Sequence, residues 1–127
     1  MTQYYIGLMS GTSMDGVDAV LVAMHGSRWH AAEAHAFLPY PDDLKQRLLA
    51  LQPAGQNELH RSQMLAQELS CLYAEVVQKL LRETQMQPAH IRAVGCHGQT
   101  VRHAPEHGYS IQLANLPLLA EETGIFT

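Results

Sequence analysis

Cysteine and long apolar runs are what this sequence lacks most clearly. Its 127 residues contain two cysteines, Cys71 and Cys96, too few for the disulfide framework of a small secreted domain. Each lies in a helix-like or strand-like segment, where a single thiol is typically a small buried apolar group. No apolar run approaches the roughly 20 residues needed to span a bilayer, so we expect no membrane association.

Positive charge is also scarce. Eight Lys and Arg residues against twelve Asp and Glu give a formal net charge of −4, and the basic residues form no cluster. This balance argues against nucleic acid or an anionic membrane as a partner. The first residues lack the basic start and cleavage-site pattern of a secretory signal, so the expected location is the cytoplasm. A small anionic ligand would have to be bound locally, by loops.

What the sequence has is a 46% share of apolar residues, enough to build the core of one domain. Five apolar runs have the length and composition of strands: residues 4–10, 17–24, 29–38, 91–96 and 109–113. The first two are apolar at alternating positions on both sides, which predicts strands buried on both faces.

Three segments have helical patterns. Pro41 and the acids after it begin a short helix that places Leu44, Leu48 and Leu51 on one face. A longer helix from about 57 to 85 has apolar residues spaced by 4, 3, 4 and 4, a wide face typical of core packing. Asn115 is positioned to cap a third helix that ends at Gly124.

The resulting order is β-β-β-α-α-β-β-α, an α/β fold, followed by an apolar ending, Ile125-Phe126-Thr127, that resembles the start of an unfinished strand.

The loop between the first two strands, Gly7 to Asp18, is the first candidate site. Its glycines allow close approach of the backbone to a ligand, and its N–H groups and the hydroxyls of Thr12 and Ser13 can donate to phosphate oxygens. Asp15 and Asp18 are oxygen ligands suited to Mg²⁺. No lysine follows Gly16 as in a P-loop, and a strand rather than a helix follows, unlike a dinucleotide site. A plain hairpin turn is the alternative.

A second polar segment, Gly95 to His103, follows the strand at 91–96. His97, Gln99 and Thr100 offer donors and acceptors suited to sugar hydroxyls or amides. The alternatives are a simple turn, a zinc site using Cys96 and nearby histidines, or a Cys-His nucleophilic pair. The spacing matches no standard zinc pattern, and neighbouring strand residues point to opposite faces.

Two motifs, Ile6-Gly7-Leu8-Met9-Ser10-Gly11-Thr12-Ser13-Met14-Asp15-Gly16-Val17-Asp18 and Gly95-Cys96-His97-Gly98-Gln99-Thr100-Val101, closely resemble those of the bacterial anhydro-N-acetylmuramic acid kinases. The stretch from Ile111 to Ile125 resembles the same family. The resemblance implies a ribonuclease H-like lobe of the actin/hexokinase-type ATPases, with a mixed sheet in β-β-β-α-β order that is incomplete at its C-terminus. Residues 1–127 would form the N-terminal part of the first kinase lobe.

The family uses ATP, Mg²⁺ and water to open 1,6-anhydro-N-acetylmuramic acid and phosphorylate it, giving N-acetylmuramic acid 6-phosphate in cell-wall recycling. A homodimer is the family's expected assembly. The different-class alternative is an actin-like module that binds nucleotide or sugar without catalysis.

Carried over by position, the resemblance assigns the ATP phosphate loop to Gly11, Thr12, Ser13, Met14, Asp15, Gly16, Val17 and Asp18. It places His97, Gln99, Thr100 and Asn115 on the sugar side. Asp15 and Asp18 would be the candidates for metal contact. No catalytic residue is assigned within the chain, because the family's general base is expected beyond Thr127.

Two positions depart from related patterns. Sugar kinases and actins usually carry Asp-x-Gly-Thr where this chain has Met9-Ser10-Gly11-Thr12, so an acid is missing there. Many family members have Gly-Asp-Pro where this chain has Ala114-Asn115-Leu116, which removes a charge from that place.

Overall fold

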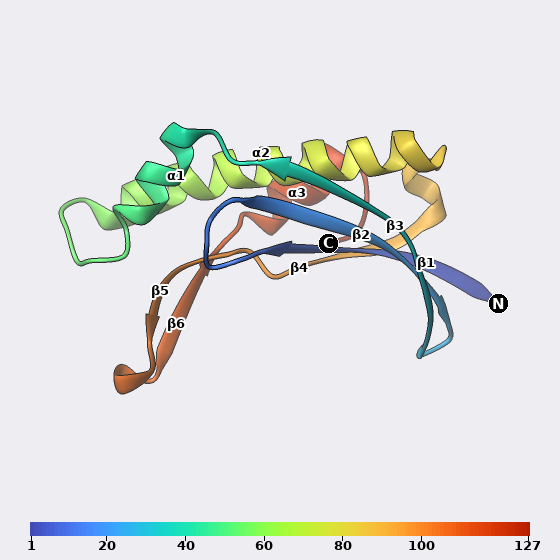
Figure 1. Cartoon of the computed structure of the whole chain (residues 1–127), viewed down its shortest axis with the longest axis horizontal. Coiled ribbons are helices and arrows are strands. Elements are labelled where there is room, and N and C mark those ends of the chain that lie inside the picture. The colour runs from blue at the N-terminus through green and yellow to red at the C-terminus, as the bar shows by residue number, and fades with distance from the viewer.

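Three helices lie over one face of a four-stranded sheet, and no helix lies over the other face (Figure 1). The computed structural model describes all residues, 1–127. The strands are β1 (Thr2–Ser10), β2 (Gly16–His25), β3 (Arg28–Pro39), β4 (Ile91–Cys96), β5 (Gln99–Ala104) and β6 (Tyr109–Leu113). The helices are α1 (Asp42–Leu49), α2 (Glu58–Thr84) and α3 (Leu116–Thr123), with short 3₁₀ turns at Pro88–His90 and Pro105–His107. None of the helices combines the length and the hydrophobicity that a membrane span requires.

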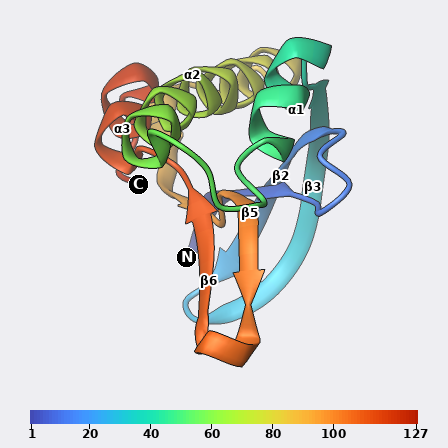
Figure 2. The ribbon, with the colours of Figure 1, turned by 90° about the vertical axis from the view of Figure 1, so that its left-hand side faces the viewer.

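The sheet is mixed, as the family resemblance implies. Its strand order is β3-β2-β1-β4; β1 and β3 each pair antiparallel with β2, and β4 pairs parallel with β1. Parallel neighbours such as β1 and β4 need a crossover connection, and here the chain reaches β4 from β3 through α1 and α2. A separate two-stranded hairpin, β5-β6, projects from the end of β4 (Figure 2).

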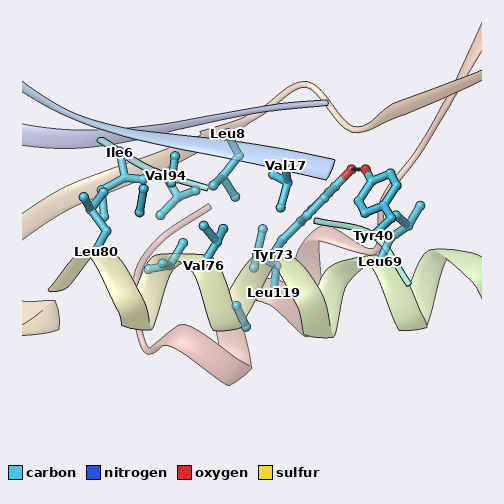
Figure 3. Close-up of a cluster of buried hydrophobic side chains, with 14 of the residues drawn as sticks. Ile6, Leu8, Val17, Tyr40, Leu69, Tyr73, Val76, Leu80, Val94 and Leu119 are labelled. Atoms are coloured by element: carbon cyan, nitrogen blue, oxygen red, sulfur yellow. Dashed lines mark hydrogen bonds between the residues drawn. The ribbon is translucent and has the colours of Figure 1, made fainter. Parts of the chain in front are cut away.

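The core lies between the sheet and α2. The apolar stripe predicted for the long helix is confirmed: α2 runs from Glu58 to Thr84, close to the predicted 57–85. Ile6, Leu8 and Val17 of the sheet face Leu69 and Val76 of α2 in Figure 3. The helix is stabilised because most of its wide apolar face is covered by strands on one side and by α3 along its flank.

The prediction that β1 and β2 are buried on both faces is wrong for these residues. Ile6 and Leu8 point under the helices and are buried, whereas Met9, on the opposite face, is 56% exposed. Along β2 buried residues alternate with half-buried ones. The cause is the one-sided placement of the helices, which leaves the second apolar face of the sheet uncovered.

Strand β5 is not among the strands predicted from the sequence. Its buried positions are Gln99, Val101 and Ala104, so a polar residue occupies an inward place and the strand bulges between Thr100 and Arg102. Both features break the period-2 pattern from which strands are predicted.

Three smaller expectations have different outcomes. Cys71 is exposed on α2, so its predicted burial is wrong, while Cys96 is half-buried. Asn115 caps α3 as predicted, since its Oδ1 accepts from the N–H of Leu118 at 3.1 Å. The residues after Gly124 do not form the predicted strand start, although the N–H of Val94 donates to the carbonyl of Phe126 at 2.8 Å, which places this segment beside β4.

Candidate functional site

The loop between β1 and β2 presents unpaired hydrogen-bond donors. Gly11, Thr12, Ser13 and Asp15 are exposed, and their backbone N–H groups make no hydrogen bond within the chain. The hydroxyls of Thr12 and Ser13 are also unengaged by other protein groups. Successive free N–H groups with adjacent hydroxyls form an anion-binding surface.

The same loop is anchored by residues that face the core. Met14 adopts a left-handed conformation (φ 57°), its side chain is 1% exposed, and its N–H donates to the carbonyl of Gly11 at 3.2 Å. A β-carbon on Gly16 would lie 2.3 Å from the carbonyl oxygen of Leu38, so only glycine fits there. Val17 is fully buried. Three of the eight predicted phosphate-loop residues, Met14, Gly16 and Val17, therefore fasten the loop by their packing.

The two aspartates occupy different surroundings. Asp15 lies in the exposed loop, with its carboxylate 3.3 Å from the Lys45 ammonium of α1. Asp18 lies within β2 on the uncovered sheet face, 2.6 Å from Nε2 of His35. No three His, Cys, Asp or Glu side chains gather as a metal site.

The second polar segment lies beside this loop. Because β1 and β4 run parallel, their carboxyl ends meet at one edge of the sheet, the usual ligand position in an open α/β sheet. The N–H of His97 donates to the carbonyl of Leu8 at 3.2 Å, so the segments that follow the two strands begin side by side. His97 is exposed and Thr100 half-buried, with its Oγ1 accepting from the Gln112 amide at 3.3 Å.

Gln99 does not face solvent: its exposed fraction is 0%. Its Nε2 donates to the carbonyls of Gly11 and Thr100, each at 3.1 Å, and its Oε1 accepts from the Tyr40 hydroxyl at 3.0 Å. Both amide hydrogens and the amide oxygen are thus engaged. The Gln99 side chain directly joins the two polar segments that the sequence analysis singled out.

Three hydroxyl groups continue this buried cluster. Ser10 Oγ lies 2.6 Å from the Tyr40 hydroxyl and 2.8 Å from the Tyr73 hydroxyl. Figure 3 shows the two tyrosines meeting at one end of the apolar core. Burial raises the pKa of both tyrosines above the usual 10, so both stay neutral and keep their hydroxyl hydrogens.

Asn115 and Cys96, the remaining candidates, do not present free reactive groups to a ligand. Asn115 is half-buried, its Oδ1 is used by the α3 cap, and its N–H donates to Ser70 Oγ at 2.8 Å. Burial raises the pKa of the Cys96 thiol, only partly offset by a backbone hydrogen bond from Gly98, so this thiol is not activated as a nucleophile.

Two residues that sequence reasoning missed contact the site. Tyr40 touches Gln99 and its N–H donates to the carbonyl of Asp15 at 2.9 Å, and Lys45 places a positive charge beside the loop. Both lie some 25 to 60 residues from their partners in the chain, so no local sequence pattern could identify them.

Comparisons with known proteins agree on one family. A family model described as "Anhydro-N-acetylmuramic acid kinase" matches residues 3–127. Proteins of that name from Neisseria meningitidis serogroup C (strain 053442) and Neisseria gonorrhoeae (strain ATCC 700825 / FA 1090) are 67% and 68% identical over 126 residues. One from Chromobacterium violaceum is 52% identical over 125 residues. These matches cover 98 to 99% of this chain and 34% of each relative. The chain therefore spans about a third of the length of the relatives it matches.

Proposed function

We propose, since this chain belongs to the anhydro-N-acetylmuramic acid kinase family, that the protein is an ATP-dependent kinase for 1,6-anhydro-N-acetylmuramic acid. The reaction would open the anhydro ring with water and phosphorylate the sugar, giving N-acetylmuramic acid 6-phosphate in cell-wall recycling. The observation that supports it most is the exposed loop of free donors at the carboxyl edge of the sheet, joined by Gln99 to the second family motif.

In this proposal the loop from Gly11 to Asp18 binds the phosphates of ATP. The N–H groups and hydroxyls of Thr12 and Ser13 donate to phosphate oxygens, while Met14, Gly16 and Val17 hold the loop against the core. Phosphoryl transfer depends mainly on such positioning and on stabilising the charge of the transferred group.

The loop offers enough protein ligands for Mg²⁺, because this ion needs only one or two carboxylates from the protein. The ion typically keeps several waters and binds one or two carboxylates together with substrate phosphates. Asp15 is exposed in the loop and is the better placed carboxylate, because Asp18 is engaged by His35 on the sheet face. When bound, the ion would neutralise phosphate charge; Lys45 beside Asp15 adds a positive charge from the protein.

The anhydro-sugar would lie next to the phosphates, against the segment after β4. His97 is exposed there and Thr100 is partly so, which suits both for sugar hydroxyls or the acetamido group. Gln99 would support them from within, and Asn115 would act through the start of α3.

The proposal assigns no general base to these residues. The relatives are about three times as long as this chain. We therefore propose that residues 1–127 form the N-terminal part of the first lobe. The general base and the second lobe would belong to the part of the intact protein that corresponds to the relatives' remaining length. We also propose that the intact protein is a homodimer and that it acts in the cytoplasm.

The test is product formation by the intact protein that contains this chain. With ATP, Mg²⁺ and 1,6-anhydro-N-acetylmuramic acid, mass spectrometry should detect N-acetylmuramic acid 6-phosphate. The double variant Thr12→Ala, Ser13→Ala should lower kcat/KM for ATP by at least roughly tenfold, because even one lost hydrogen bond to a charged group costs about 1.5–3 kcal/mol. Binding of nucleotide and sugar without product would instead support a non-catalytic module.

A further inference from the structure

The cluster of Ser10, Tyr40, Tyr73 and Gln99 has no chemical role in the proposed reaction, yet it reaches the phosphate loop. All four side chains are buried, and the amide of Gln99 ends at the carbonyl of Gly11. Buried side-chain polar atoms without a partner are absent from the structure. In a low-dielectric interior a fully satisfied network of this kind specifies geometry strongly.

The carbonyl of Gly11 is held from two directions. It accepts from the N–H of Met14 at 3.2 Å and from Gln99 Nε2 at 3.1 Å. A trans peptide unit is planar, with its C=O and the following N–H pointing in opposite directions. Since the structure has no cis peptide, holding the Gly11 carbonyl toward the buried cluster turns the N–H of Thr12 away from it, toward the exposed side of the loop.

We propose that Gln99 and Tyr40 are positioning residues for ATP: Gln99 orients the Gly11–Thr12 peptide so that its N–H faces the phosphates, and Tyr40 holds the Gln99 amide in that orientation. This inference rests on the proposed function, because it needs a phosphate at the loop. Gln99 then acts on the nucleotide side of the site, although this residue lies in the motif that the family resemblance places on the sugar side.

The experiment compares ATP with adenosine as ligands of the intact protein, measured by calorimetric titration. Gln99→Met preserves side-chain length but removes the amide, and Tyr40→Phe removes only the hydroxyl that holds it. Each should weaken ATP binding by roughly five- to thirtyfold and change adenosine binding by less than about twofold, because adenosine has no phosphate to be received.

Tyr73→Phe is the matched control. It removes a hydroxyl from the same buried cluster, but Tyr73 contacts Ser10 and Tyr40 and not Gln99. This variant should lower the melting temperature like Tyr40→Phe and leave the affinity ratio of ATP to adenosine unchanged. If Gln99→Met fails to fold, Tyr40→Phe still tests the proposal.

The outcomes separate this inference from the proposed function. If the unmodified protein binds ATP no more tightly than adenosine, the phosphate loop itself is refuted, and the inference with it. If it prefers ATP and both variants retain the full preference, only the positioning role is overturned. Equal losses for ATP and adenosine would also overturn it, since they would indicate general destabilisation.

Discussion

Gly16, at the start of β2, lies too close to β3 to carry a side chain. A β-carbon there would lie 2.3 Å from the Leu38 carbonyl oxygen and 2.6 Å from the Phe37 ring. Gly16→Ala should therefore lower the free energy of unfolding by about 1–3 kcal/mol, as overpacking in a tight site does. Urea denaturation of the intact protein would measure it.

Gly7→Ala is the matched control for that change. Gly7 lies in β1 with nothing within 4 Å of its would-be β-carbon and no positive φ. Alanine should leave stability unchanged or raise it by up to about 1 kcal/mol. Similar losses for both variants would show that the contact with Leu38 does not constrain the loop.

His97 is the exposed side chain on which the sugar-side proposal depends most. We expect His97→Ala to raise KM for the anhydro-sugar at least roughly fivefold, the value of one lost hydrogen bond, while KM for ATP changes less than about twofold. His103→Ala, an exposed histidine farther along β5, is the control and should change neither constant. Equal rises in both constants for His97→Ala would refute the sugar-side placement.

At the scale of elements, Arg102 of β5 fastens the segment between α1 and α2. Its guanidinium donates to the carbonyls of Leu51, Gln52 and Pro53 at 2.7 to 3.0 Å and pairs with Glu58 at the start of α2. Arg102→Gln should therefore lower the urea midpoint more than Glu58→Gln, which removes only one of these contacts.

The pair also predicts a pH dependence. The hydrogen bond from Arg102 lowers the pKa of Glu58 below its ordinary 4.5. A lowered carboxyl pKa contributes stability that is present above the unfolded value and lost as pH falls through the folded value. The difference in urea midpoint between the unmodified protein and Glu58→Gln should thus be present at pH 7 and shrink below about pH 4.5. A difference that grows with acid would contradict the pairing.

How far sequence predicts an element depends on whether its pattern is local. The α2 stripe repeats every three or four residues, so its bounds were predicted to within one residue at each end. Strand β5 was missed because Gln99 occupies a buried place that apolar residues usually fill. The partners that satisfy its amide there include Tyr40, 59 residues away, and Gly11, 88 residues away.

The same limit applies to the candidate site. The family motifs identify both polar segments, and the structure brings them together through the parallel pairing of β1 and β4. The order of residues in the sequence does not predict which residues of each motif face outward. Met14 and Gln99 look like loop residues in the sequence, yet both are buried, because the partners that bury them come from distant elements.

At the scale of the whole molecule, the sheet has one covered and one uncovered face. The uncovered face of β1 and β2 includes Met9 and half-buried Val20 and Val22. Its apolar character is why the sequence predicts burial on both sides, although the three helices cover only one (Figure 1). The relatives are about three times as long as this chain.

A structure of the intact protein with Mg²⁺ and a non-hydrolysable ATP analogue would test the proposed phosphate loop most directly. Terminal phosphate oxygens should lie about 2.7–3.2 Å from the backbone nitrogens of Thr12 and Ser13, with the Gln99 amide still donating to the Gly11 carbonyl. Phosphates bound elsewhere, with those N–H groups facing water, would contradict the proposed phosphate loop.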